Sequence, residues 1–279
     1  MSHPIYPCLW FDGKAKEAAD FYCSVFSGTT ITSENPLVVT LDAAGQKFML
    51  LNGGPFFTLN PAISFYVVCE TTDEIDRAWE KLSDGGFALM PLDTWPWSSK
   101  YGWVQDKFGV SWQLSLGKLE NVAQKFIPCL MFTQQFAGRA ESAIQFYTSV
   151  FAGSSVFGIL KYTADDPDVE GTVKHAQFTL GKQVFMAMDS SLSHQFCFNE
   201  AVSLVQECDT QDEIDYYWEK LSAVPEAEQC GWLKDQFGVS WQVVPKILEE
   251  LMNDPSRSQR VMNAFMQMKK FDIAKLLEA

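Results

Sequence analysis

The chain has 279 residues, of which 47% are hydrophobic and 20% charged, and its formal net charge is −14. A chain of this length can bury one or two cores, and the negative charge repels nucleic-acid phosphates and anionic lipid headgroups. We therefore expect a globular protein of two domains, with no nucleic acid and no membrane as partner.

No segment reaches the roughly 20 apolar residues that a membrane helix needs, and residues 1–11 lack a basic flank followed by a long apolar run. The seven cysteines include no C-x-x-C pair and mostly stand in apolar runs. These features predict a cytoplasmic protein whose cysteines are reduced core thiols.

In chain order, the first half alternates between strand-like and helix-like segments. Residues 14–26 place apolar side chains at helical spacing, and strand-like segments follow at 36–42 and 47–52. The pattern then restarts with the strand-like segment 62–70 and a second helix at 71–83, whose T-x-x-E start is a capping box. Each half is therefore predicted to be a strand, a helix and further strands, written twice.

A long internal repeat organises the whole chain. GWVQDKFGVSWQ at 102–113 matches GWLKDQFGVSWQ at 231–242 in nine of twelve positions, and the helix at 71–83 matches TQDEIDYYWEKLS at 210–222. Such a long period is not that of a solenoid. We predict a tandem pair of modules with a helical tail, at 1–120, 121–247 and 248–279.

The repeated D-x-F-G phrase predicts a tight turn that ends in a strand. Asp106 and Gly109 suit the first and fourth positions of a type I turn, in which the aspartate accepts backbone N–H groups. On the strand beyond it, Ser111 and Gln113 share one face and Trp112 takes the other. The tryptophan face is expected to pack on helices, and the polar face to border water, a cavity or a partner. The second module repeats the polar pair as Ser240 and Gln242.

These features together resemble the vicinal oxygen chelate superfamily, which includes glyoxalase I, bleomycin-resistance proteins and extradiol dioxygenases. NPAISF, MPL with its following tryptophan loop, KYGWVQDKFGVSWQ and the end MKKFDIAKLLEA resemble the PhnB-like branch, often labelled 3-demethylubiquinone-9 3-methyltransferase domain. The resemblance implies an α+β fold in which each module forms a cup-shaped incomplete barrel from two βαβββ units. It also implies an intramolecular pseudo-dimer, or a homodimer.

In enzymes of the superfamily a divalent metal lies on the concave face, with a Glu of the last strand among its ligands. The resemblance places Gln113 and Gln242 at that position and Ser64 and Ser203 on the fifth strands. An amide lacks the charge that helps to hold a dication. The resemblance thus implies a small-molecule-binding protein without a cofactor. The alternative is a metal-dependent lyase, isomerase or dioxygenase whose zinc, nickel or manganese ion is held by His175, Asp189 and Gln242.

Methyl transfer is not expected, because the sequence has no glycine-rich loop after a first strand that could bind S-adenosylmethionine.

The two halves differ most in the segment 85–103, whose counterpart at 223–232 is much shorter. We expect it to be an irregular rim insertion, with Trp95, Trp97 and Tyr101 forming a lid over an apolar or planar ligand. Alternatively, these rings seal a sheet edge or the contact between modules. The predicted ligand-binding residues are Ser64, Tyr66, Trp95, Trp97, Tyr101, Ser111, Gln113, Ser203, Ser240 and Gln242.

In the tail, Asp254 and Pro255 separate two predicted helical stretches. Val261, Met262 and Phe265 begin a methionine-rich apolar face in the second stretch. Methionine fills irregular gaps, so this face is expected to close one cup, bridge the modules or form a dimer seam.

Overall fold

The computed structural model describes residues 3–279, which form two compact units. The large unit is Pro7–Val202, and the small unit combines the N-terminal residues up to Tyr6 with Ser203–Ala279. None of the helices within residues 3–279 is both long and apolar enough to cross a membrane.

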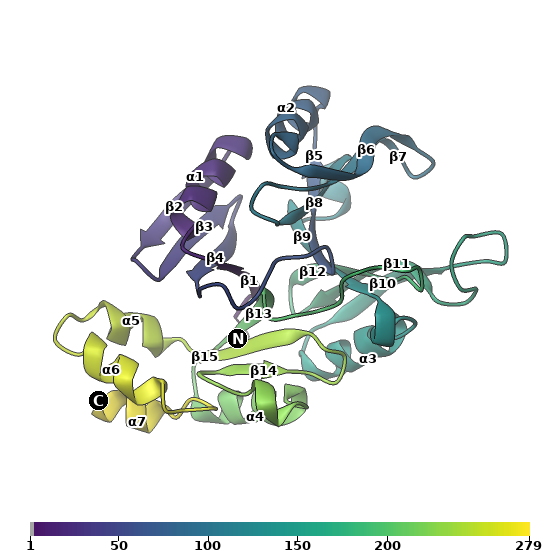
Figure 1. Cartoon of the computed structure of the whole chain (residues 1–279). Helices are drawn as coiled ribbons and strands as arrows, with labels where there is room; N and C mark the ends of the chain where they lie inside the picture. Colours follow the sequence, from purple (N-terminus) through teal and green to yellow (C-terminus); the bar gives the residue numbers. More distant parts are fainter. Residues whose placement is uncertain (1–2) are drawn as a thin grey trace. The chain divides into compact units, whose positions relative to one another are not determined.

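The large unit contains three α-helices among its strands (Figure 1). The helices are α1 (Ala15–Val25), α2 (Thr72–Ser83) and α3 (Ala140–Val150), with the short 3-10 helices η1 (Leu119–Asn121) and η2 (Gln134–Phe136). The strands are β1 (Tyr6–Phe11), β2 (Thr29–Glu34), β3 (Val38–Ala43), β4 (Gln46–Asn52), β5 (Ile63–Cys69), β6 (Phe87–Trp95), β7 (Ser98–Gln105), β8 (Ser111–Leu116), β9 (Phe126–Phe132), β10 (Ser155–Lys161), β11 (Val173–Leu180) and β12 (Gln183–Asp189).

An eight-stranded sheet in the order β10-β11-β12-β9-β5-β8-β7-β6 dominates the large unit. Strands β5–β8 come from the first sequence repeat and β9–β12 from the second. The two halves meet where β5 pairs antiparallel with β9, which sets Ser64 opposite Cys129 and Tyr66 opposite Ile127. The α+β class is confirmed, and the sheet combines strands from both sequence repeats. The module boundaries remain a prediction, because this sheet runs continuously across the first of them.

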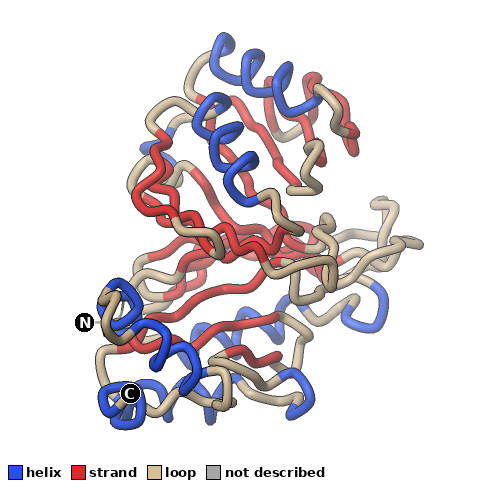
Figure 2. Tube along the Cα trace, turned by 60° about the vertical axis from the view of Figure 1, so that its left-hand side comes forward, coloured by secondary structure: helices blue, strands red, loops and turns tan. Residues whose placement is uncertain are grey.

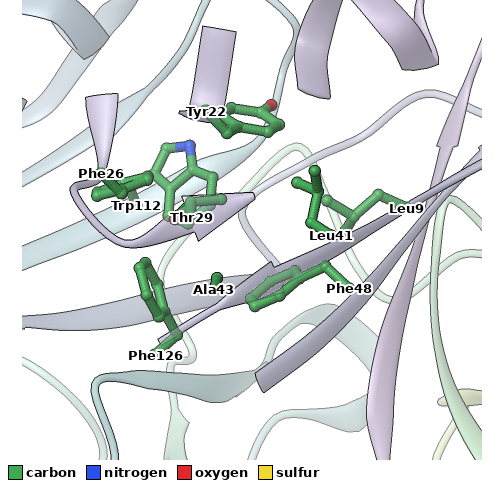
Figure 3. Close-up of a pocket in the computed structure, with 9 residues that line it drawn as sticks. All are labelled: Leu9, Tyr22, Phe26, Thr29, Leu41, Ala43, Phe48, Trp112 and Phe126. Carbon is green, nitrogen blue, oxygen red and sulfur yellow. The ribbon is translucent and has the colours of Figure 1, made fainter. Parts of the chain in front are cut away.

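Helix α1 covers a second group of strands in the large unit, ordered β1-β4-β3-β2 (Figures 1 and 2). Its buried face is rich in alanine, at Ala15, Ala18 and Ala19, so the helix packs closely on the strands. Beneath it lies an apolar void of about 10 Å³, lined by Tyr22, Trp112 and seven other residues (Figure 3). Such a volume holds no more than about one water molecule. We interpret it as a packing gap.

The predicted turn at Asp106 is confirmed. One carboxylate oxygen accepts from the backbone N–H groups of Phe108 and Val110, at 2.8 and 3.0 Å. The other accepts from the indole N–H of Trp112 at 2.8 Å and the hydroxyl of Tyr22 at 3.0 Å. The buried carboxylate therefore ties the turn, the following strand and helix α1 together, and the tryptophan face packs on a helix as expected.

The small unit contains β13 (Val202–Cys208), α4 (Gln211–Leu221), η3 (Pro225–Ala227), β14 (Trp232–Lys234) and β15 (Ser240–Pro245), followed by the tail helices α5 (Ile247–Asn253), α6 (Ser258–Phe265) and α7 (Ile273–Glu278). The strands pair in the order β14-β15-β13. Asp235 repeats the turn, accepting from the N–H groups of Phe237 and Val239 and from the Trp241 indole. The capping box that the sequence match to 71–83 implies for α4 is present at Thr210 and Glu213.

Three local expectations need correction. The segment expected to be an irregular insertion is the hairpin β6–β7, whose register slips at three places and whose edge strand tolerates Pro91. The tail has three helices instead of two, with the additional break between Phe265 and Ile273. In α2, Thr71 accepts from the N–H of Glu74, but the Glu74 carboxylate accepts from the N–H of Glu70, so the box is shifted by one residue.

The end of the tail docks on its own unit. The N–H groups of Cys230 and Gly231 donate to the carbonyls of Met268 and Lys269, both at 2.8 Å. The side chain of Gln211 donates to the Phe271 carbonyl at 3.1 Å and accepts from the Ile273 N–H at 2.9 Å. The segment between α6 and α7 therefore lies against the chain just before β14 and against the start of α4.

Candidate ligand-binding site

One face of the eight-stranded sheet carries most of the predicted site, and we name it the amide face after Gln113. Strand pairing places Tyr66 beside Gln113 and Gln113 beside Trp103, so these three side chains share the face. It continues across β9 and β12, where Cys129 pairs with Met186. The face therefore brings together residues of both sequence repeats.

Hydrogen bonds lock the centre of the amide face. The Tyr101 hydroxyl donates to the Gln113 carbonyl oxygen at 2.7 Å, and the Gln113 amide nitrogen donates to the Ser64 hydroxyl at 2.7 Å. Ser111 accepts from the Trp103 indole at 2.7 Å. Gln113 is only 3% exposed. The amide predicted to contact a ligand is thus bound by protein partners on both ends, and direct ligand contact by Gln113, Ser64 and Ser111 remains a prediction.

Burial keeps the titratable groups of this centre neutral. It raises the pKa of Tyr101, and it raises the pKa of Cys129 to about 12. It also raises the pKa of the half-buried Tyr66, whose hydroxyl bonds to Ser115. Near neutral pH these groups are therefore hydrogen-bond donors and acceptors without charge, and Cys129 is not a nucleophile.

The aromatic residues of the β6–β7 hairpin form a continuous ladder above this centre. Trp95 and Trp97 stack with ring centroids 5.4 Å apart, and Trp97 meets Tyr101 edge-on at 5.8 Å. The Trp95 indole donates to the Tyr101 carbonyl at 3.1 Å, which fixes its ring. Trp97 is 59% exposed. An exposed ring in contact with a buried polar centre is suited to stacking on a ligand.

A tightly packed apolar cluster occupies the middle of the amide face. Ile127, Cys129, Val184 and Met186 are buried there, and Val122 of the segment that joins the repeats packs against them. The Gln124 side chain from the same segment donates to the Val184 carbonyl at 3.0 Å and accepts from its N–H at 2.8 Å. The joining segment therefore covers the end of the face at Ile127 and Val184.

The small unit repeats part of this arrangement. The Gln242 amide donates to Ser203 at 2.9 Å, as Gln113 does to Ser64. Ser240 differs from Ser111, because its hydroxyl is buried without a hydrogen-bond partner in the described part of the chain. Aligned on the Gly-Trp pairs, Cys230 takes the place of Tyr101, and its thiol contacts the Phe265 carbonyl at 3.6 Å.

The donors on the amide face do not fit a divalent cation. Within residues 3–279, no three His, Cys, Asp or Glu side chains gather as ligands. In the alternative ligand set, Asp189 accepts from the N–H groups of Ala140 and Val173. The β11–β12 register places His175 and Asp189 on opposite faces of the sheet, so the structure does not bring these two together. An amide and a hydroxyl bound to each other supply neither the charge nor the lone pairs that zinc requires.

Sequence reasoning missed Cys129 and Ser98 as members of this site; it placed Ser115 on the polar face of its strand but did not name it as a ligand-binding residue. Ser98 and Ser115 join the hairpin to β8 through a hydroxyl contact of 3.2 Å. Cys129 lies in a strand that is apolar throughout, so alternation gave no signal that one of its faces is part of a polar centre. The pairing of Ser64 with Cys129 depends on two strands far apart in the sequence.

Comparison with known proteins identifies the family. The model of the family described as 3-demethylubiquinone-9 3-methyltransferase matches twice, at residues 3–115 and 124–244. The chain belongs to this family. Its two copies of the family domain lie in tandem.

Three solved structures illustrate the similarity. A PhnB protein from Bacillus cereus is 43% identical over 39% of this chain and 96% of its own, with a TM-score of 0.37. A Staphylococcus aureus protein is 33% identical over 42% of this chain and 100% of its own, with a TM-score of 0.20. Glyoxalase I from Zea mays is 13% identical over 91% of this chain and 97% of its own, with a TM-score of 0.58, which shows a shared fold. A search of curated proteins finds no match.

Proposed function

We propose that this family member is a small-molecule-binding protein of the glyoxalase and bleomycin-resistance type, and that it takes an apolar or planar ligand on the amide face without a catalytic metal. The observation that supports this most directly is the aromatic ladder, in which exposed Trp97 connects through Tyr101 to the buried Gln113. Aromatic walls with a few fixed polar groups are typical of small-molecule sites.

The state of Gln113 favours binding over metal chemistry. Its carbonyl oxygen accepts from Tyr101 and its nitrogen donates to Ser64, so a cation at this position would have to displace the tyrosine. No carboxylate or imidazole lies among these partners to offset that loss. Metal-dependent lyase, isomerase or dioxygenase chemistry is therefore the less supported alternative.

The family description names a methyltransferase, but the site of this chain supports a different activity. The turn between β1 and α1 contains the single glycine Gly13 and no glycine-rich loop. We therefore propose that the chain does not use S-adenosylmethionine. Binding of that cofactor at micromolar affinity in a calorimeter would contradict this proposal.

The proposal also covers the assembly and the cellular location of the protein. The eight-stranded sheet joins halves of both sequence repeats, which supports an intramolecular pseudo-dimer as the functional form. The net charge of −14 and the seven free cysteines support a cytoplasmic location.

A tryptophan-fluorescence titration tests the lid. With a planar aromatic probe such as quinolin-2-one, the wild-type signal should change on binding, because the stacked indoles are partly solvated. Trp95→Ala with Trp97→Ala should abolish the change and leave the melting temperature nearly unaltered. Phe87→Ala, at an exposed ring of the same hairpin, is the matched control and should bind normally. A lower melting temperature with unchanged binding would show that the two rings only seal the sheet edge.

A further inference from the structure

The inner strands of the amide face carry no formal charge. The register of β5, β7, β8, β9, β11 and β12 assigns no Asp, Glu, Lys or Arg to this face. Asp93, on the edge strand β6, is paired with Tyr101, but it is exposed and its carboxylate accepts from the Thr94 N–H at 2.7 Å. A charged ligand buried here would lose its hydration without gaining a counter-ion.

Two polar side chains on β11 differ from the locked centre around Gln113. His175 and Gln177 are half-buried and project from the amide face, where Gln177 pairs with Met186, the β12 neighbour of Cys129. Among the described residues neither side chain is joined to another by a hydrogen bond, and neither is sealed away from solvent. Half-buried polar groups of this kind are available to a ligand, whereas the amide of Gln113 is already occupied.

His175 and Gln177 can both form hydrogen bonds with a ligand without carrying a charge. Burial lowers the pKa of His175, so the imidazole is uncharged at neutral pH and has one donor and one acceptor nitrogen. The Gln177 amide likewise offers both a donor and an acceptor. Met188 lies half-buried beside them on β12 and supplies an adaptable apolar surface.

We infer that His175 and Gln177 form the specificity wall of the site and that the ligand is an uncharged, planar molecule with adjacent hydrogen-bond donor and acceptor atoms, such as a lactam or a heteroaromatic amide. This inference rests on the proposed function. It adds that these two residues recognise the ligand and that the ligand is uncharged. The two residues lie on the same face as the Tyr66–Gln113 centre, three strands away from β5 across the sheet. At about 4.8 Å per strand that separation is about 14 Å, so a two-ring ligand that contacts this wall lies over the intervening strands β12 and β9.

Three two-ring probes of similar size test the inference by calorimetry and tryptophan fluorescence. Quinolin-2-one is neutral and carries an N–H beside a carbonyl, quinoline-2-carboxylate is an anion, and N-methylquinolinium is a cation. We expect quinolin-2-one to bind and both ions to bind at least about 100-fold more weakly, because burying an unpaired charge costs several kcal/mol. Gln177→Leu and His175→Phe should each weaken quinolin-2-one binding about 10-fold.

Gln183→Leu is the matched control, since Gln183 is a half-buried glutamine on the opposite face of β12 and its replacement should leave binding unchanged. Equal binding of an ionic probe would overturn the inference. So would binding that survives both β11 variants but is lost with Trp95→Ala and Trp97→Ala, and this second result would leave the proposed function standing. Failure of all three probes to bind would overturn the inference and the proposed function together.

Discussion

The two Gly-Trp pairs of the repeat, at 102–103 and 231–232, show how the halves have diverged. A side chain at Gly102 would meet the Trp79 ring of α2 at 2.5 Å, whereas one at Gly231 would meet the Phe271 ring of the tail at 2.3 Å. The residue before each glycine is Tyr101 in one half and Cys230 in the other. The repeat thus keeps its turn and its strand, while the element that covers them differs.

This difference separates a candidate binding surface from a sealed one. In the first half helix α2 covers Gly102, and the rings of the neighbouring hairpin remain open to solvent at Trp97. In the second half the backbone of the tail is hydrogen-bonded to Cys230 and Gly231. Tail residues therefore occupy, in the small unit, the strand edge that the tryptophan hairpin occupies in the large unit.

The largest effect is expected from filling the close approaches. Gly231→Ala should lower the free energy of unfolding by about 2–4 kcal/mol, because its φ of 83° adds backbone strain to the clash with Phe271. Gly102→Ala, which has the clash without the positive φ, should cost about 1–3 kcal/mol. Urea denaturation measures both values.

A double-mutant cycle identifies the tail as the cause. In the Phe271→Ala background the cost of Gly231→Ala should fall, since the ring that a new methyl group would strike is gone. The cost of Gly102→Ala should be the same in both backgrounds. If Gly231→Ala costs equally much with and without the Phe271 ring, the tail does not determine the conformation of this segment.

A smaller effect separates the two residues that precede the glycines. Tyr101→Phe removes the donor to the buried Gln113 oxygen and should cost about 1–2 kcal/mol of unfolding free energy. Cys230→Ala loses only a weak thiol contact and should cost less. The comparison would fail if the two variants were equally destabilised, since Tyr101 would then contribute packing alone.

Local rules predicted much of the fold. The Asp106 turn, the helix at 71–83 and the strand after the turn follow from a few neighbouring residues, and their repetition doubled the signal. The superfamily resemblance then supplied the α+β architecture. By contrast, the hairpin β6–β7 was expected to be an irregular insertion because its counterpart at 223–232 is much shorter. Its Pro91 is accepted because β6 is an edge strand.

The site was less predictable because its contacts join distant strands. Gln113 was identified as a key position. Its hydrogen bonds with Tyr101 and Ser64 depend on the hairpin register and on the pairing of β5 with β8. His175 was considered as a structural residue or a metal ligand, and Gln177 was not noticed. Their shared face appears once β11 is paired with β12, which no local pattern specifies.

The metal content of the purified chain tests the central claim most directly. Elemental analysis of protein prepared without chelators should find zinc, nickel and manganese well below one ion per chain, with no difference between the wild type and Gln113→Leu or His175→Phe. Close to one tightly held ion per chain, lost in either variant, would contradict the account of an uncharged, metal-free amide face.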